Sequence, residues 1–443
     1  MFNAKRQHID KPFWKLFFIL IVVAIIALFS AGSTLAYADD SMLGPILKQI
    51  IFIGLGVAAA WFVQFLPTWS IRLGGYGLLA FSILCILLIL PSNSPFASNI
   101  NEASRWFKLG ALQFQPSELA KLSLIIVVAD LLTRIKDEAS ERKYFFITLG
   151  LTGVTCFPIM LSNLSTAILL AGIIFLMWFL ARINWRYYCT VAGICVALMI
   201  MGYFIVEFGY VRPDRDMSGP FKRAKLWVKR VDAKIQDNNT NAAVFRLTDE
   251  NYQSSIAKVA VARGGKTPIG VLPGNSQERD FLPLAYADYI FAIIVEETGI
   301  VGAFLLILLY LAVLVRACYA STKFADSASM LMVMGLALMI TCQALISMAV
   351  AVGLGPVTGQ PLPMISKGGT SVTVTSLYFG IMMCVAREQN ELQAKQQTVK
   401  QESFNDIPTI TLDLDPNDNV NGANISNRQD NVNIIENNNI SNT

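Results

Sequence analysis

Three groups of polar residues could do chemistry in this strongly apolar chain. The first contains Glu118 and Lys121, which follow Pro116, a residue that suits the first turn of a helix. Residues three apart lie on one face of a helix, so the two charges can neutralise each other. The spacing therefore predicts either a buried ion pair that fixes helix packing or a pair within a polar cavity. Arg105, just upstream, is expected near the same surface.

The second group centres on Asp288, which directly precedes a long apolar run. A carboxylate at the start of a helix is favoured by the helix dipole, and a carboxylate is also a candidate general base. Glu296 and Glu297 lie deeper in the same run. At about 100° per residue, Glu296 lies about 80° from Asp288 around the helix and Glu297 about 180°, so at most Glu296 shares the Asp288 face.

The third group is the segment 355–371, where glycine and proline are too frequent for a continuous helix. Irregular backbone at membrane depth is tolerated where it lines protein or a water-filled cavity. Free amides, hydroxyls and an ammonium group would suit an anion such as a diphosphate, and a simple turn is the alternative. The candidate ligands are Ser366, Lys367, Gly368, Gly369 and Ser371.

Other kinds of site are excluded. His8 is the single histidine, and the seven cysteines lie in or beside apolar runs without CxxC spacing, so neither a histidine triad nor a zinc site is expected. The stretch Gly264–Thr267 resembles the end of a nucleotide-binding loop, but Ala260 stands where that pattern needs glycine. A net charge of +4 is too small to indicate nucleic acid binding.

The elements that position these residues are membrane helices. The 443 residues are 54% apolar and 15% charged, with a mean hydropathy of +0.52. Apolar runs of roughly 20 residues, enough to cross a bilayer, recur along the chain. The sequence therefore predicts an all-α integral membrane protein with about ten transmembrane helices. The expected spans are 13–37, 44–66, 70–91, 116–134, 144–162, 164–182, 186–209, 287–316, 327–353 and 369–386.

Lysine and arginine are concentrated in one set of short connections, which places both termini in the cytoplasm. Residues 1–12 form an N-terminal tail, 13–387 the membrane domain and 388–443 a polar cytoplasmic tail expected to be disordered. Ala36-Tyr37-Ala38 also resembles a signal-peptide cleavage site, which would remove the first span.

A large outer loop is expected at 210–286. Within it, residues 222–235 form a basic amphipathic pattern that suits an anionic membrane surface. An ordinary solvated helix would give the same pattern. The three polar groups described above all fall on the outer side in this topology.

These motifs together resemble the SEDS family (shape, elongation, division and sporulation), most closely its cell-division branch. The resemblance covers about residues 13–390 and rests on motifs in the family's order. The sequence departs from the family's pattern in three segments. Leu284, Tyr286 and Ala287 stand where the family commonly has Glu, His and Thr. The family's Ser-Tyr-Gly-Gly-Ser-Ser is Ser-Lys-Gly-Gly-Thr-Ser at 366–371, and its Gln-Pro-Asp-Leu-Gly-Thr is Leu-Ser-Asn-Leu-Ser-Thr at 161–166. The matching segments are Arg105-Trp106, Gln115-Pro116-Ser117-Glu118, Pro273-Gly274-Asn275-Ser276, Asp288, Gln343-Ala344 and Gly353–Ser371.

The resemblance implies an inverting peptidoglycan glycosyltransferase that polymerises lipid II on the outer face of the cytoplasmic membrane during division. Asp288 would be the catalytic base. The implied partners are a class B penicillin-binding protein, which supplies the transpeptidase, other division proteins at the septum, and membrane lipids. No cofactor is established, and a divalent cation (Mg²⁺ or Mn²⁺) bridging Asp288 and the diphosphate is one option. The implied substrate-binding residues are Arg105, Glu118, Lys121, Ser366, Lys367, Gly368, Gly369 and Ser371.

Other functions fit some of the same features. A lipid II flippase would also need a polar interior within a ten-span bundle, but with polar sites reachable from both faces. The cytoplasmic connections are short and merely basic, which favours an enzyme that works outside. An elongation-type polymerase and a non-catalytic scaffold for division proteins are the remaining alternatives.

Overall fold

The structure is a computed structural model, and it describes residues 9–39, 43–90, 97–100, 103–109, 112–207, 252–282, 286–324, 326–355 and 358–405. The predicted basic helix at 222–235 lies outside these residues. One compact unit extends to Leu392, and a second unit begins at Gln393.

Every one of the ten predicted spans contains a helix. The helices α2 to α8 are Lys11–Asp39, Leu43–Val63, Thr68–Ile89, Pro116–Leu132, Glu138–Ser162, Leu164–Leu180 and Trp185–Glu207. The later helices are α11 (Ile290–Ser321), α12 (Ser327–Ala351) and α13 (Gly369–Asn405). Seven helices among the described residues are long and apolar enough to cross a membrane, so the chain is a multi-pass membrane protein. The count of ten crossings stays a prediction.

Local signals in the sequence set where several helices begin. Pro116 occupies the first turn of α5, where its missing N–H has no cost. Asp137 caps α6 by accepting the amide of Ser140 at 3.2 Å. Asn163 and Asp326 cap α7 and α12 in the same way.

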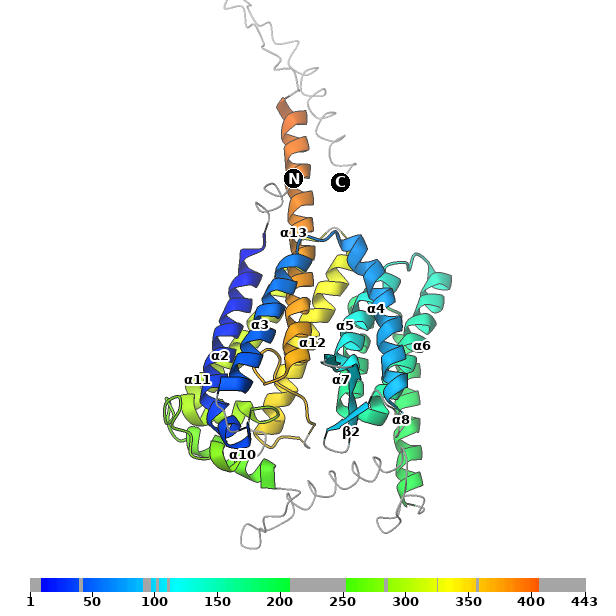
Figure 1. Cartoon of the computed structure of the whole chain (residues 1–443). Helices are drawn as coiled ribbons and strands as arrows, with labels where there is room; N and C mark the ends of the chain where they lie inside the picture. The colour runs from blue at the N-terminus through cyan, green and yellow to red at the C-terminus, as the bar shows by residue number, and fades with distance from the viewer. Residues whose placement is uncertain are drawn as a thin grey trace, which may run out of the picture. The chain divides into compact units, whose positions relative to one another are not determined.

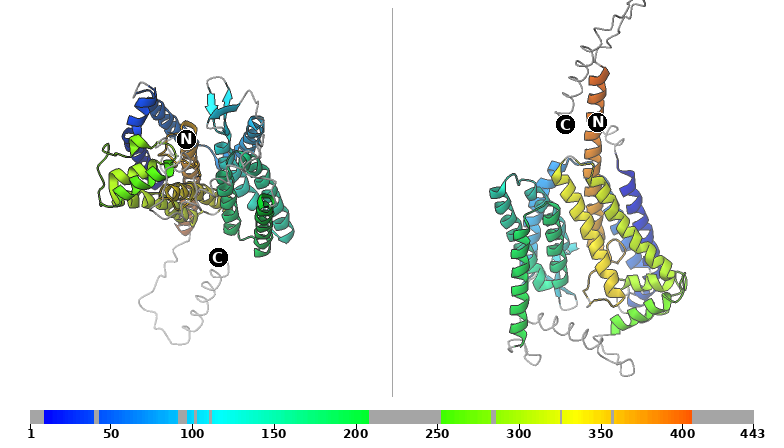
Figure 2. Two further views of the ribbon diagram at one scale, coloured as in Figure 1. Left: turned by 90° about the horizontal axis from the view of Figure 1, so that it is seen from below. Right: turned by 180° about the vertical axis from the view of Figure 1, so that it is seen from behind.

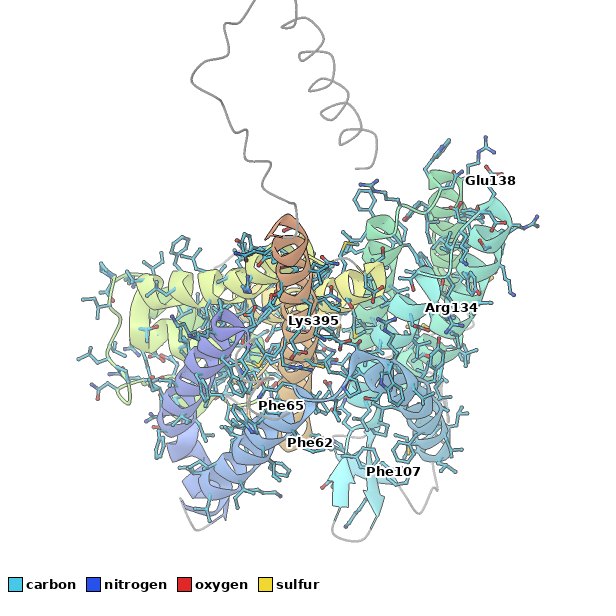
Figure 3. The ribbon with its side chains drawn as sticks, turned by 90° about the horizontal axis from the view of Figure 1, so that it is seen from above. Phe62, Phe65, Phe107, Arg134, Glu138 and Lys395 are labelled. Atoms are coloured by element: carbon cyan, nitrogen blue, oxygen red, sulfur yellow. The ribbon has the colours of Figure 1, made fainter. Side chains whose placement is uncertain are left out.

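Within the first unit, α5, α12 and the start of α13 form the interior. Nearly all residues of α5 are buried, and α12 packs against α5 and α7 on one side and α11 on the other. Figures 1 and 2 show α4 to α8 grouped on one side of α12, and α2, α3, α10 and α11 on the other. Apolar side chains such as Phe62, 68% exposed, point outward from the helices, as expected for surfaces that face lipid (Figure 3).

Two features of the connections differ from the sequence prediction. Three short strands, β1 (Ala97–Ile100), β2 (Ala103–Leu109) and β3 (Leu112–Phe114), form an antiparallel sheet that the sequence did not predict, beside the helical bundle. Phe107 of β2, labelled in Figure 3, packs against Cys85 and Ile89 of α4. The predicted outer loop 210–286 contains α10 (Tyr252–Gly264), which packs along α11, and a short 3-10 turn, η2 (Arg279–Phe281).

The tail prediction was wrong at its start, because α13 continues as a helix to Asn405. Residues 388–405 are rich in Glu, Gln and Lys, which are good helix formers. Arg387 also pairs with Glu391 one turn later. Residues 406–443 lie outside the described part of the chain.

Candidate functional site

The Asp288 turn and the glycine-rich segment lie against each other. Asp288 is half-buried in the turn that precedes α11. The buried Ser366 hydroxyl accepts the Leu362 amide at 2.8 Å and donates to the carbonyl of Ala287 at 2.6 Å. The Lys367 amide donates to the carbonyl of Tyr286 at 2.9 Å. Ser366 therefore fixes the residue directly before the candidate base, and the two groups of residues lie in contact.

Positive groups gather beside this turn. The Lys367 ammonium lies 4.7 Å from the centre of the Tyr286 ring, a cation–π contact. The first amides of α13, from Gly369 to Ser371, precede the first intrahelical bond, which runs from the amide of Val372 to the carbonyl of Gly368. Such amides form the positive end of a helix and can bind an anion. The arrangement suits a phosphate group near Lys367.

Gly369 also has a packing role. A Cβ atom at this position would lie 2.5 Å from the Phe52 ring of α3. Glycine therefore lets the start of α13 approach α3 closely, and a side chain here would push the helix start away. Ser371, in the first turn, is buried, and its carbonyl accepts the Thr375 hydroxyl at 2.8 Å.

The Glu118–Lys121 pair forms as the spacing predicted. The Lys121 ammonium, fully buried, lies 2.8 Å from the Glu118 carboxylate and donates to Gln343 Oε1 of α12 at 2.9 Å. Gln343 Nε2 in turn donates to the carbonyl of Pro361 at 3.0 Å. The pair thus reaches the glycine-rich segment through Gln343, and these contacts match the packing alternative that the sequence left open.

Two more side chains hold the same segment. Gln360 donates to the hydroxyl of Thr166 in α7, and Tyr310 of α11 donates to the carbonyl of Pro363 at 2.5 Å. Residues 360–366 are therefore tied to α7, α11 and α12. This fixes irregular backbone that has no secondary structure of its own, as preorganisation of a site requires.

Arg105 lies on β2, and its side chain falls outside what the structure describes. Its predicted part in the site is therefore not tested. The Gly264–Thr267 stretch is an ordinary helix end and turn, in which the Thr267 hydroxyl accepts the Gly270 amide at 3.1 Å.

Sequence reasoning missed the part played by Glu296 and Glu297. Both are buried, and each carboxylate binds the 274–279 segment that folds over α11. Glu296 accepts the Ser276 hydroxyl and the Gln277 amide (3.1 Å), with Arg263 3.7 Å away. Glu297 accepts the Gly274 amide at 3.0 Å.

A second contact of Glu297 reaches another helix. The Ser30 hydroxyl of α2 donates to the same carboxylate. Arg279 donates to the carbonyl of Ser30 at 2.7 Å. The two glutamates therefore act as positioning residues that tie the loop before Asp288 to α11 and α2. Adjacent acidic residues in an apolar run were the one available signal.

Close backbone packing supports the same region. Gly270 and Gly299 have φ values of 71° and 70°, which favour glycine. Gly299 interrupts the helical geometry of α11 two residues after Glu297. A Cβ atom on Gly264 would lie 2.0 Å from the Val295 carbonyl oxygen, so α10 reaches α11 because this position has no side chain.

Among the described residues, no three His, Cys, Asp or Glu side chains come together to hold a metal ion. One carboxylate is nevertheless compatible with Mg²⁺, which usually binds through one or two carboxylates together with substrate phosphates. Asp288 beside a phosphate at Lys367 would have that composition.

Fold and site together define a multi-pass membrane protein with a polar site at one end of its helical bundle. A profile described as a cell cycle protein, for FtsW, RodA and SpoVE, matches residues 10–391. The chain belongs to this FtsW/RodA/SpoVE family, which is the SEDS family that the motifs indicated.

Curated relatives agree along most of the chain. Stage V sporulation protein E of Bacillus subtilis (strain 168) is 28% identical over 83% of this chain and 94% of its own length. A probable peptidoglycan glycosyltransferase FtsW of Marinobacter nauticus is 29% identical over 84% and 88%, respectively. The peptidoglycan glycosyltransferase MrdB of Escherichia coli (strain K12) is 26% identical over 68% and 76%.

Solved structures share the fold. A chain from a peptidoglycan synthase complex, studied for its coordination of polymerization and crosslinking, matches with a TM-score of 0.66 at 25% identity, over 86% of this chain and 98% of that one. The crystal structure of Thermus thermophilus rod shape determining protein RodA matches with a TM-score of 0.59 at 24% identity, over 86% and 97%.

Proposed function

We propose that the chain is a peptidoglycan glycosyltransferase that polymerises lipid II into glycan strands during cell division. Relatives named as peptidoglycan glycosyltransferases support the reaction class. The observation that carries the proposal is the Ser366 hydroxyl bridge to Ala287, which joins the Asp288 carboxylate turn to the Lys367 side of the site. A base and an anion-binding group then lie on adjoining segments, as this transfer requires.

The reaction joins two lipid-linked sugars. A sugar hydroxyl of one lipid II attacks the anomeric carbon of the growing chain, whose bond to undecaprenyl diphosphate breaks with inversion. Asp288 accepts the hydroxyl proton as attack proceeds, because it is the carboxylate in the turn that faces this segment. Half-burial leaves it open to substrate while limiting competing water.

The leaving diphosphate gains negative charge in the transition state, and oriented positive groups stabilise it. Lys367 and the first amides of α13 supply such groups, with Arg105 a further candidate. A divalent cation (Mg²⁺ or Mn²⁺) held by Asp288 and the diphosphate would add positive charge at the same place. Glu118 and Lys121 act one step away, because they support Pro361 through Gln343.

The site requires an outward orientation. The positive-inside pattern supports an orientation with the sheet, α10 and the 354–368 segment outside and both termini in the cytoplasm. Lipid II would then enter from the outer leaflet. Crosslinking of the new strands needs a transpeptidase, so a class B penicillin-binding protein is the expected partner, with other division proteins at the septum.

The test is polymerisation of lipid II by the purified full chain with its penicillin-binding partner. Asp288→Asn should lower the rate about 10²–10⁴-fold, the usual contribution of a general base. Asn is nearly isosteric, so the variant should fold and bind the partner. Asp280→Asn is the matched control, because this carboxylate is exposed; it lies 3.4 Å from the largely buried Arg279, whose bond to the Ser30 carbonyl does not use the carboxylate.

Each other outcome points elsewhere. If Asp288→Asn polymerises lipid II at the parental rate, Asp288 is not the base. If the parental protein makes no glycan but moves labelled lipid II across vesicle membranes, the chain is a flippase. If it does neither yet binds its partners, it is a scaffold.

A further inference from the structure

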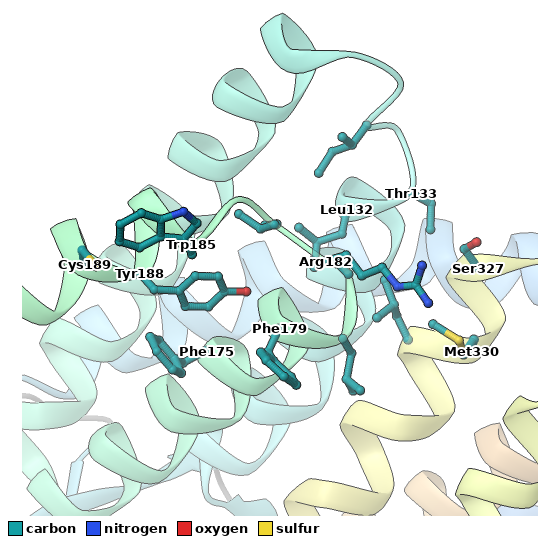
Figure 4. Close-up of a pocket in the computed structure, with 15 residues that line it drawn as sticks. Leu132, Thr133, Phe175, Phe179, Arg182, Trp185, Tyr188, Cys189, Ser327 and Met330 are labelled. Atoms are coloured by element: carbon teal, nitrogen blue, oxygen red, sulfur yellow. The ribbon is translucent and has the colours of Figure 1, made fainter.

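A large cavity lies at the other end of the bundle, among the ends of α5 and α7 and the starts of α8 and α12. Its volume is about 1250 Å³. Phe175, Phe179 and Trp185 supply much of its wall, and Figure 4 shows them on neighbouring turns of α7 and α8. Phe179 and Trp185 are each 69% exposed, so the cavity opens on the lipid-facing side of the helices.

Arg182 is held in an unusual backbone conformation beside this cavity. Its amide donates to Phe179 and that of Ile183 donates to Trp178, at 3.0 and 3.3 Å, which is the Schellman arrangement at the end of α7. Glycine is usual at the Arg182 position, because φ there is 58°. The cap itself needs no arginine. The side chain extends across the cavity toward Ser327 and Met330 of α12 (Figure 4).

Charge and hydrogen bonding around the cavity are unbalanced. Within the described part of the chain, Arg182 has no ion-pair partner, whereas nearby Arg134 pairs with Asp130 at 2.6 Å. The Glu141 carboxylate accepts the Asn184 amide at 2.6 Å. The Tyr188 hydroxyl is buried and has no partner among the described residues, and the Tyr188 side chain forms part of the cavity wall (Figure 4).

We propose that this cavity binds one anionic glycerophospholipid. Its phosphate pairs with the Arg182 guanidinium, and an acyl chain follows Phe175 and Phe179. Arginine suits phosphate because its planar donors bind two oxygens at once. The sideways opening admits a lipid from the bilayer, and Trp185 stands where tryptophan marks the membrane interface. The predicted orientation places the cavity in the cytoplasmic leaflet, whose anionic lipids attract basic groups.

Cysteine protection tests this proposal in the full chain. Cys189 lines the cavity, and Cys318 is an exposed thiol of α11 that does not line it. We expect phosphatidylglycerol, added to phosphatidylcholine nanodiscs with the same acyl chains, to slow N-ethylmaleimide labelling of Cys189 several-fold. Labelling of Cys318 should not change. Peptide mass spectrometry measures both rates in one sample.

Two variants locate the effect. Arg182→Gln should weaken phosphatidylglycerol binding about tenfold, as loss of a charge-assisted hydrogen bond does. Arg186→Gln is the matched control, since Arg186 is exposed and does not line the cavity. Arg182→Gly should also lose protection while folding at least as well as the parent, because glycine prefers this backbone conformation.

Five results would overturn the proposal. If protection survives Arg182→Gln, the guanidinium has no role in binding. If phosphatidylcholine alone gives full protection, the anionic headgroup has no role. Protection by inorganic phosphate alone means a phosphate site. If an equal concentration of undecaprenyl phosphate displaces phosphatidylglycerol, the cavity is a site for the polyprenyl lipid. A co-purified protein segment crosslinked at Cys189 means a protein interface.

Discussion

Removing the Lys121 ammonium tests how the bundle holds the site. In Lys121→Met, Glu118 keeps its position, 5% exposed, but loses the cation 2.8 Å away. Breaking a buried ion pair by removing one partner typically costs about 3–5 kcal/mol. Gln343 also loses the donor at its Oε1. We therefore expect the free energy of unfolding to fall by about 3–5 kcal/mol.

Exchanging the two charges should recover part of this loss. Glu118→Lys with Lys121→Glu restores opposite charges at the same spacing, but it points a carboxylate at Gln343 Oε1. In the parent, Gln343 Nε2 donates to the Pro361 carbonyl at 3.0 Å. If the Gln343 side-chain amide turned to donate to the new carboxylate, its oxygen would face that carbonyl instead. One buried polar group stays unsatisfied, at about 1–3 kcal/mol. The exchange variant should lie between the parent and Lys121→Met.

Unfolding by sodium dodecyl sulfate in mixed micelles, followed by tryptophan fluorescence, gives the three stabilities. Lys136→Met is the control, because Lys136 is exposed and its loss should change stability by less than about 0.5 kcal/mol. A Lys121→Met variant as stable as the parent would refute the reasoning, as would an exchange variant with full stability. Parental polymerase activity in the exchange variant would remove any substrate contact of this pair.

Three further predictions concern other parts of the chain. Ser366→Ala leaves the amide of Leu362 and the carbonyl of Ala287 unpaired, so we expect about 1–3 kcal/mol lower stability in the same micelle assay. The polymerisation rate per folded molecule should also fall, and an unchanged rate would show that Ser366 has no part in the site. Glu296→Gln should lower stability through its lost charge-assisted bonds yet keep the rate per folded molecule, and a large loss of that rate would give Glu296 a catalytic part. Deleting residues 406–443 should leave membrane insertion and purified activity intact, whereas loss only in cells would assign the segment to partner recruitment.

Much of the fold follows from hydrophobic runs and helix-start signals. Runs of about 20 apolar residues locate the spans, because an α-helix satisfies its own backbone hydrogen bonds and most other backbone conformations cannot cross a bilayer. The Glu118–Lys121 contact follows from i,i+3 spacing. Asp288 can lie beside Ser366 and Lys367 only if both segments are at the same end of the bundle. The order of the spans along the chain already implies this.

The rest depends on contacts between distant segments, which spacing does not reveal. Residues 97–114 have no run of alternating polarity long enough to indicate strands. Glu296 and Glu297 point to different sides of α11, and only the path of the 274–279 segment shows that both hold it. The helix at 388–405 shows that low hydrophobicity alone does not exclude helix when the residues are good helix formers.

The contact between Gly264 and the Val295 carbonyl has a genetic consequence. Gly264→Ala would place a methyl carbon 2.0 Å from the Val295 carbonyl oxygen. The substitution should therefore abolish function as completely as a change at Asp288. Dominance distinguishes the two. A folded Asp288→Asn protein competes with the parental copy for the partner and is dominant negative, whereas a misfolded Gly264→Ala protein is degraded and recessive.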